Sequence, residues 1–413
     1  MSANSAPMGV DEHLALILEQ IRELPAYDQP LLETLGLPAV EDVVSPLSLP
    51  VFDNSAMDGY AVVFRDVAEA TPERPVHLPV VGEIAAGQTQ IFAMSPGTAV
   101  RIMTGAPVPT GCTAVVPIEH TDEGIATVQV RQAPRAEGQH IRRAGEDVKA
   151  GDIVLRAGER MDARRAGLLA SVGIGRIPTR PRPRVVVMST GSELVEPGEP
   201  LGRDNIHDAN SYLLAAAVRQ TGAIAYRVSA IPDDPEAFIE ALNDQLVRAD
   251  VVVTSGGVSK GTYDVVKEAL SALGTVDFRE VAMQPGKPQG FGTVGEDSTP
   301  IFTLPGNPVS AYVSFEVFVA PALRKMMGRT PYNRSLVRAT LTSEVSSIKG
   351  RRQFLRGFFE PRVGGSVVTP VGGPGSHLLG GLAQANALIV LAEDITSVSA
   401  ESDVPVLLLD REY

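Results

Sequence analysis

The chain is short of sulfur and of positive charge. Its 413 residues include a single cysteine, Cys112, and one thiol excludes both an internal disulfide and a cysteine-rich zinc site. Lys and Arg number 36 against 49 Asp and Glu, which gives a formal net charge of −13. An acidic field of this size repels nucleic acid and anionic lipid, so we expect neither as a partner. A local cationic patch can still bind a small anion.

Long apolar runs and targeting signals are also missing. No uncharged run approaches the ~20 residues that a membrane-spanning helix needs, and the apolar stretch at 309–323 is interrupted by Glu316. Residues 1–10 lack the basic and apolar regions of a signal peptide. We therefore expect a cytoplasmic protein that does not enter a membrane.

The composition is that of a globular protein, with 44% hydrophobic and 21% charged residues, and the length suits about two to four domains. Apolar residues at helical spacing predict a helix over 11–24, and a short helix is expected at 29–35. Residues 51–139 are typical of short β-strands between Gly and Pro turns. Asp162 predicts the N-cap of a helix that ends at Gly173.

An α/β region is predicted after the stiff Arg-Pro segment 180–184. Strands and helices alternate there, which implies a doubly wound, mostly parallel sheet with helices on both faces. From residue 332 the helical period disappears, so a small β domain is expected at the C-terminal end. The expected strands are 185–188, 224–229, 251–254 and 301–304, and the expected helices are 211–220 (capped by Asn210), one that begins at Asp234-Pro235, 264–273 and 308–327.

Three of these strands end in glycine turns. Glycine lets a backbone N–H approach a ligand closely, and ligands of doubly wound sheets bind beyond the carboxyl ends of the strands. A single such turn is ordinary loop punctuation, but three at one edge favour an anion site. Neither the Walker nor the dinucleotide glycine spacing follows a strand. The turns are Ser189-Thr190-Gly191, Ser255-Gly256-Gly257 and Pro305-Gly306-Asn307-Pro308.

Carboxylates lie beside these turns: Glu193, Asp208 and Asp264. Two or three carboxylates near a phosphate are what Mg²⁺ requires, because it prefers oxygen ligands and substrate phosphates. Each residue also has a plain interpretation, with Asp264 as a helix N-cap and Glu193 as a solvated charge.

The remaining candidate site residues are two cations and a serine motif. Lys287, in a Pro-Gly-Lys-Pro turn, and Arg356, in an arginine-rich segment, suit an oxyanion, with a solvated surface as the alternative. The stretch 257–261 matches the Gly-x-Ser-x-Gly elbow of serine hydrolases around Ser259. The one histidine after it, His377, lies in the separate C-terminal region, so we disfavour a hydrolase.

Several loops carry small polar residues around acids, and together with the turns they resemble the MoeA/gephyrin E-domain family, the molybdopterin molybdenumtransferases of molybdenum cofactor synthesis. The resemblance covers nearly the whole chain. Six motifs occur in the order typical of the family, and such a series is very specific. They are residues 53–61, 101–109, 189–194, 255–259, 285–288 and 304–310.

The resemblance implies an elongated homodimer whose active cleft lies between the α/β domain of one subunit and the inserted β domain of the other. It implies that adenylylated molybdopterin and molybdate react with Mg²⁺, that molybdenum enters the dithiolene and that AMP leaves. A MogA-type adenylyltransferase is an expected partner. The implied domains are an extended helical dimerisation part (1–50 and 140–181), an inserted β domain (51–139), a MogA-like molybdopterin-binding α/β domain (182–331) and a C-terminal β domain (332–413).

The resemblance also implies roles for individual residues. Asp58, Thr104, Asp147, Glu193 and Asp264 carry over as the catalytic set, with Glu193 and Asp264 as Mg²⁺ ligands. Molybdate would be held by Lys287, Arg356 and Ser376. The pterin and its phosphate would be held by the three glycine turns together with Asp208, Asn210 and Ser310.

The chain departs from the family at four positions. Ser192 and Thr262 stand where acids are usual, and Gln284 stands where Lys is usual. Lys260 is an unusual cation, which we expect to restore the lost charge. These departures leave open a pterin-binding or carrier relative that has lost turnover. Because Asp58, Thr104, Glu193 and Asp264 are all present, we expect an active enzyme.

Overall fold

The computed structural model describes residues 7–87, 93–256 and 265–410. Contacts divide the chain into two compact units, of which the first holds the residues up to 28, residues 36–40 and those from 178 onward. The second holds residues 29–35 and 41–177. The four-domain division remains a prediction. The helix near the N-terminus, which we expected in the dimerisation part, belongs by its contacts to the first unit.

The first unit is built on a six-stranded sheet in the order β15-β12-β16-β20-β19-β17. Its first four strands are parallel, as expected. The last two, which the sequence did not reveal, run antiparallel to their neighbours β20 and β19. In chain order the strands are β12 (Arg184–Ser189), β15 (Ile224–Arg227), β16 (Val251–Ser255), β17 (Val276–Glu280), β19 (Pro288–Val294) and β20 (Thr299–Leu304).

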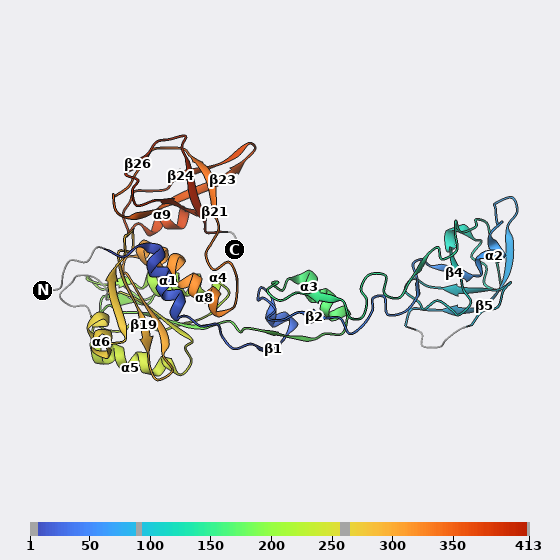
Figure 1. Ribbon diagram of the computed structural model, residues 1–413, viewed down its shortest axis with the longest axis horizontal. Helices are drawn as coiled ribbons and strands as arrows, with labels where there is room; N and C mark the ends of the chain where they lie inside the picture. Colours follow the sequence, from blue (N-terminus) through green and yellow to red (C-terminus); the bar gives the residue numbers. More distant parts are fainter. Residues whose placement is uncertain (1–6, 88–92, 257–264, 411–413) are drawn as a thin grey trace. The chain divides into compact units, whose positions relative to one another are not determined.

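Helices cover both faces of this sheet (Figure 1). On one face α5 and α6 pack against Val186 and Val252, and on the other α1, α4, α7 and α8 pack against Val185 and Val253. Because both faces are buried, the central strands are runs of valine rather than alternating sequences. The helices are α1 (Val10–Gln20), α4 (Ala209–Gln220), α5 (Pro235–Leu246), α6 (Val265–Leu273), α7 (Pro308–Ser314) and α8 (Ala320–Met326).

Four predicted helices differ in detail. The helix expected over 11–24 ends at Gln20. Asp208, not Asn210, is the N-cap of α4, and its side chain accepts a hydrogen bond from Ser211 N. The expected helix at 308–327 is interrupted by a π-helix, Phe315–Val319, between α7 and α8. The expected short helix at 29–35 is a 3₁₀ turn, Leu31–Thr34.

Residues after 335 form a sheet in which β23, β24, β21, β27 and β25 close into a ring. The ring encloses an apolar core that includes Leu341, Val368 and Ile389. A two-residue strand, β18, adds to β23. The elements are β18 (Met283–Gln284), β21 (Leu336–Leu341), β22 (Val345–Ser346), β23 (Arg352–Arg362), β24 (Gly365–Pro370), α9 (Leu379–Gln384), β25 (Ala387–Leu391), β26 (Ser397–Val398) and β27 (Asp403–Leu408).

The second unit contains a five-stranded sheet in the order β7-β4-β6-β5-β8. Its strands lie within residues 51–139, where short β-strands are expected from the sequence. The elements are β2 (Val43–Val44), β3 (Asn54–Ser55), β4 (Gly59–Val62), α2 (Phe64–Val67), β5 (Val76–Ile84), β6 (Ala99–Ile102), β7 (Ala114–Pro117), the 3₁₀ turn Ile118–His120, β8 (Thr127–Val130), β9 (Ile141–Arg142), β10 (Ile153–Leu155) and α3 (Ala163–Ser171). The short strands β1 (Tyr27–Pro30) and β11 (Arg176–Thr179) pair where the chain passes from one unit to the other.

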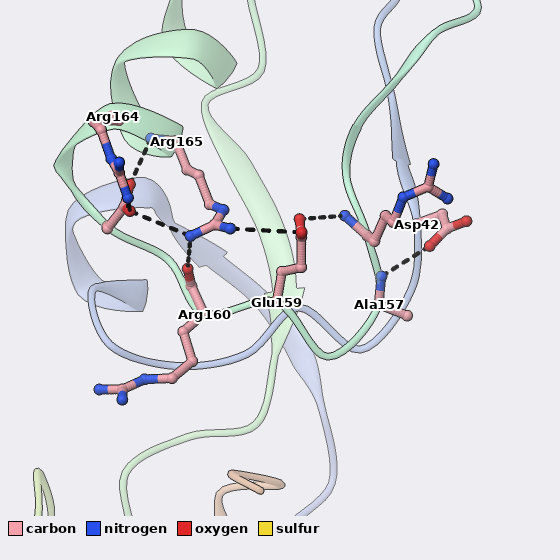
Figure 2. Close-up of polar contacts among 8 residues, drawn as sticks. Asp42, Ala157, Glu159, Arg160, Arg164 and Arg165 are labelled. Atoms are coloured by element: carbon pink, nitrogen blue, oxygen red, sulfur yellow. Dashed lines mark hydrogen bonds and ion pairs between the residues drawn. The ribbon is translucent and has the colours of Figure 1, made fainter. Parts of the chain in front are cut away.

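The predicted N-cap of α3 is confirmed, and it lies in a network of ion pairs (Figure 2). Asp162 Oδ1 accepts a hydrogen bond from Arg165 N at 2.9 Å, and Asp162 Oδ2 accepts one from the Arg164 guanidinium at 2.6 Å. Arg165 also donates to the carbonyl of Arg160 and pairs with Glu159. Among the described residues, no helix is long and apolar enough to cross a membrane.

Candidate functional site

The three glycine turns lie on neighbouring strands. β12, β16 and β20 are adjacent and parallel, so their carboxyl ends meet at one edge, as predicted. We call this the carboxyl edge, meaning residues 189–193, 208–210, 255–256 and 305–310. A Cβ on Gly256 would lie 3.0 Å from the carbonyl oxygen of Thr190, and one on Gly306 would lie 3.5 Å from Gly256 Cα. Gly256 is crowded by backbone and has a φ of +97°, which favours glycine, whereas the contact at Gly306 is of ordinary length.

Asn210 ties two of the turns together. Its Nδ2 donates to Ser255 Oγ at 2.8 Å and to the carbonyl oxygen of Gly306 at 2.6 Å. Asp208 is only 1% exposed, and its Oδ1 accepts from Ser211 N at 3.0 Å. α4 thus presents both predicted side chains to the carboxyl edge.

The same edge holds polar atoms that the described part of the chain does not satisfy. Ser189 Oγ, Asp208 Oδ2 and Asn210 Oδ1 are buried and have no hydrogen-bond partner there. Buried polar atoms without a partner are rare, because each costs free energy comparable to a lost hydrogen bond. Such atoms beside a crowded glycine cradle fit a ligand-binding site.

Glu193 lies near the start of an excursion, the segment 191–207, in which the chain leaves this edge before returning to it at Asp208. The Glu193 side chain is exposed, and its Oε2 would lie 2.7 Å from a Cβ on Gly191, so the carboxylate folds back beside that turn. Ser192, one of the departures from the family, makes a reciprocal pair of hydrogen bonds with Asp233, both 3.0 Å long. Ser192 therefore anchors the loop.

The C-terminal ring brings Ser376 to this edge. Val309 N, in the first turn of α7, donates to the carbonyl oxygen of Ser376 at 3.0 Å. Arg356 is buried, and its guanidinium donates to the carbonyl oxygens of Leu378 (2.7 Å) and Gly373. Burial lowers the pKa of Arg356 from its ordinary value. Arg356 thus holds the loop that carries Ser376.

Lys287 forms an ion pair with a nearby residue of the same domain, Glu280. Its Nζ lies 2.7 Å from Glu280 Oε2, at the junction of β17 and β19. Gln284, where the family usually has Lys, accepts a hydrogen bond from Arg351 at 3.0 Å. No hydrogen bond or ion pair that the structure gives to Lys287 joins it to Arg356 or Ser376.

The second unit brings its own motif loops together. Asp58 Oδ1 accepts hydrogen bonds from Thr104 N (2.6 Å) and Thr104 Oγ1 (2.8 Å), which hold the pKa of Asp58 below its usual value. Asp53 pairs with Arg143 at 2.6 Å. Asp147 is exposed. Its backbone N–H donates to the carbonyl oxygen of Leu49, and no recorded hydrogen bond among the described residues joins it to Asp58 or Thr104. The spacing of Asp58 and Thr104 along the chain does not indicate that these two residues form hydrogen bonds with each other.

Several predicted residues lie outside the described residues: Gly257, Ser259, Lys260, Thr262 and Asp264. Among the residues that the structure does describe, no group of three or more His, Cys, Asp and Glu is arranged to hold a metal. The protein oxygen atoms at the carboxyl edge include the Asp208 and Glu193 carboxylates, the Asn210 amide and the Ser189 hydroxyl. An all-oxygen set of this kind fits Mg²⁺, which needs only one or two carboxylates when phosphates supply the rest.

Sequence reasoning missed three residues behind this edge: Glu196, Tyr212 and Arg227, which form an ion-pair cluster. Arg227 is the last residue of β15. The position of a residue at the end of a parallel strand, which singled out the glycine turns, is the signal that could have found it.

Family models match three consecutive stretches of the chain. The MoeA N-terminal region (domain I and II) matches residues 8–173, the probable molybdopterin binding domain matches 186–325, and the MoeA C-terminal region (domain IV) matches 338–409. The chain belongs to the MoeA family.

Curated relatives and solved structures agree with this assignment. Molybdopterin molybdenumtransferase 2 of Mycobacterium tuberculosis is 48% identical, over 96% of this chain and 98% of the relative. Molybdopterin molybdenumtransferase of Haemophilus influenzae is 37% identical, over 89% of each. Two structures of MoeA proteins from Pyrococcus horikoshii, titled as molybdopterin biosynthesis proteins, are each 30% identical, with TM-scores of 0.81 and 0.74. They cover 98% and 97% of this chain and 100% of their own chains.

Proposed function

We propose that this protein inserts molybdenum from molybdate into adenylylated molybdopterin and releases AMP, as a cytoplasmic enzyme of molybdenum cofactor synthesis. Two MoeA relatives, 48% and 37% identical, are named molybdopterin molybdenumtransferases. The observation that carries the proposal is the carboxyl edge, where a glycine cradle adjoins buried polar atoms without a partner among the described residues.

The chemistry of these atoms suits the proposed substrate. Asp208 Oδ2 and Asn210 Oδ1 are hydrogen-bond acceptors, and they match N–H donors of a pterin ring or the water shell of a hydrated cation. The turns at Gly256 and Gly306 present backbone without side chains, which suits close approach of a phosphate. The substrate thus replaces the missing hydrogen bonds.

Mg²⁺ is part of the proposal, with Glu193 and Asp264 as its protein ligands. When bound, the ion would offset charge on the phosphates. The exposed carboxylate of Glu193 lies beside Gly191, in the turn that we propose to hold the phosphates.

Molybdate is proposed to lie near Ser376, with Lys287 and Arg356 contributing positive charge. Arg356 acts at least through the loop that it holds, because two carbonyl oxygens of that loop accept its hydrogen bonds. Lys287 must leave or share Glu280 to reach an oxyanion.

The acids of the second unit, Asp58 and Asp147, and the hydroxyl of Thr104 complete the proposed working set. Hydrogen bonds from Thr104 keep the pKa of Asp58 low, so the carboxylate is ionised at neutral pH and can orient an attacking oxygen by accepting a hydrogen bond from it. The cleft is proposed to unite this group with the carboxyl edge of a partner subunit in a homodimer.

Exposed apolar side chains support the dimer. Leu32 and Val44 are 75% and 50% exposed in the isolated chain, within the predicted dimerisation part. A stretch of this kind fits burial against a second copy. A MogA-type adenylyltransferase is the proposed source of the adenylylated pterin.

AMP release by the purified protein, given adenylylated molybdopterin and Mg²⁺ with and without molybdate, tests the proposal. We expect release that depends on molybdate and that Asp58→Asn and Glu193→Gln each lower strongly, to a measurable residual rate. Tight pterin binding without AMP would identify a carrier instead. Light scattering on the same samples tests the homodimer.

A further inference from the structure

A cluster of three side chains lies behind Glu193. Glu196, directly after the short strand β13 (Leu194–Val195), forms a two-pronged ion pair with Arg227, with distances of 2.7 and 2.9 Å. Tyr212, on α4, donates its hydroxyl to Glu196 Oε2 at 3.1 Å. The Arg227 guanidinium lies 4.3 Å from the centre of the Tyr212 ring. Each member therefore fixes the other two.

The cluster lies at the carboxyl side of the sheet. Arg227 ends β15, which is parallel to β12, and Tyr212 stands in the first turns of α4, close to its N-cap Asp208. The carboxylate of Glu196 is thus held by the two elements that flank the carboxyl edge.

The excursion that carries Glu193 has anchors on both sides of that residue. Before it, Gly191 N donates to the carbonyl oxygen of Ile231 at 3.1 Å, and Ser192 bonds reciprocally with Asp233. After it, Glu196 is the one side chain between residues 194 and 200 for which the structure records a hydrogen bond or ion pair among the described residues.

The return strand β14 (Ile206–His207) closes the excursion. Ile206 N donates to the carbonyl oxygen of Glu193 at 2.9 Å, and Asp208 N donates to that of Val195 at 2.9 Å. The place of Glu193, and the link from it to Asp208, therefore depend on how firmly residues 194–196 are held.

We propose that Glu196 is a positioning residue for Glu193, acting through Arg227 and Tyr212 to hold residues 193–195 at the carboxyl edge. This inference rests on the proposed function, because the part of Glu193 in the reaction is itself proposed. Glu196 and Arg227 side chains are 33% and 25% exposed, and partly exposed ion pairs add little to global stability. Their loss should misplace the segment without unfolding the protein.

The chain contains a matched control. Arg184 and Asp250 form another two-pronged pair, with distances of 3.1 and 2.9 Å, at the amino ends of β12 and β16. This pair is on the same sheet but at the opposite edge from Glu193. Asp250→Asn should therefore leave turnover unchanged.

The test is steady-state AMP release by the full-length protein. A displacement of about 1 Å can cost on the order of 100-fold in rate, so we expect Glu196→Ala to lower kcat about 30-fold, with KM for the pterin within about twofold. Arg227→Met should have a similar effect and serves if Glu196→Ala does not fold. Tyr212→Phe, which removes one hydrogen bond, should cost about threefold.

The rate of Glu196→Ala in the Glu193→Gln variant distinguishes a positioning role of Glu196 from a purely structural one. If Glu196 acts through Glu193, then Glu196→Ala has no further effect on the residual rate of Glu193→Gln. A full additional loss in that background would overturn the proposal. So would a kcat of Glu196→Ala equal to that of the wild type, or an equal loss in Asp250→Asn.

Hydrogen–deuterium exchange tests the positioning without turnover. Glu196→Ala should speed exchange at the amides of Ile206 and Asp208, whereas Asp250→Asn should not. Unchanged exchange at both amides would also overturn the proposal. A wild type without molybdate-dependent AMP release would sink the proposed function instead, and the exchange result would still decide whether Glu196 holds the segment.

Discussion

Two acidic clusters at helix starts differ in how their oxygens are used. At α3, in the second unit, Asp162 accepts hydrogen bonds with both oxygens, from Arg165 N and from the Arg164 guanidinium. At α4, in the first unit, Asp208 uses one oxygen as an N-cap, and the other is buried with no partner among the described residues. The satisfied cluster stabilises a helix end, and the unsatisfied one fits a substrate. Polar atoms that are left unpaired thus distinguish a site from a scaffold.

The largest expected effect comes from Gly256→Ala at the carboxyl edge. The new Cβ would meet the Thr190 carbonyl oxygen at 3.0 Å, so the cradle must widen, and we expect pterin affinity to fall about 100-fold. Calorimetric titration with adenylylated molybdopterin measures it. Gly364→Ala is the control, because Gly364 has a similar φ, +92° against +97°, and nothing within 4 Å of the new Cβ. Both changes carry the ~1 kcal/mol strain of a left-handed residue, so equal affinity would contradict the crowding argument.

Asp208→Asn should separate stability from function. Asparagine also caps helices, while the unpaired buried oxygen loses its charge, so we expect the ligand-free protein to gain about 1 kcal/mol in the free energy of unfolding. Turnover should fall about 30-fold, because a substrate contact is weakened. Denaturant unfolding and AMP release measure the two effects. Asp234→Asn, at the N-cap of α5, should change neither by much, and a less stable Asp208→Asn protein would count against the unpaired-atom account.

Thr104→Val should have a smaller effect, in the second unit. It removes one of the two hydrogen bonds that hold the pKa of Asp58 low, so that pKa should rise toward 3.8 while the carboxylate stays ionised at pH 7. We expect turnover to fall about tenfold, since a positioned hydrogen bond is lost. Carboxyl NMR titration gives the pKa. An unchanged Asp58 titration would show that the backbone N–H alone sets it.

Asp162→Ala should leave turnover unchanged and lower only the stability of α3. Hydrogen bonds from Arg164 and Arg165 lower the pKa of Asp162 from 3.8 to about 2. A depressed folded-state pKa contributes stability that is fully present above pH 3.8 and is lost as the pH falls through about 2. The melting temperature of the variant should therefore be lower than that of the wild type at pH 5, and the difference should shrink toward pH 2. A pH-independent difference would mean that the carboxylate charge is not what stabilises the cap.

Much of the first unit could be predicted from local signals. The valine runs of β12 and β16 and the turns that follow them identified the carboxyl edge before any topology was known. The strands β17 and β19 escaped because Val276–Glu280 carries three charges and Pro288–Val294 is rich in glycine. The pairing of β19 with β20, and of β17 with β19, supplies the burial that their own sequences do not indicate.

Contacts between distant residues could not be predicted. Glu196 and Arg227 are 31 positions apart, and Asp58 and Thr104 are 46 apart. Only the parallel register of β12 and β15, or the closure of the motif loops in the second unit, brings these pairs together. The N-cap of α4 was misplaced by two residues because Asp208 and Asn210 are both good capping residues.

Exchange protection by the bound substrate tests the central claim most directly. Hydrogen–deuterium exchange of the wild type, with and without adenylylated molybdopterin, should show protection at residues 189–193, 208–210, 305–310 and 375–377. The α3 cap, residues 157–165, should exchange equally in both samples. Protection at the α3 cap with none at the carboxyl edge would contradict the claim that unpaired buried polar atoms identify the binding site.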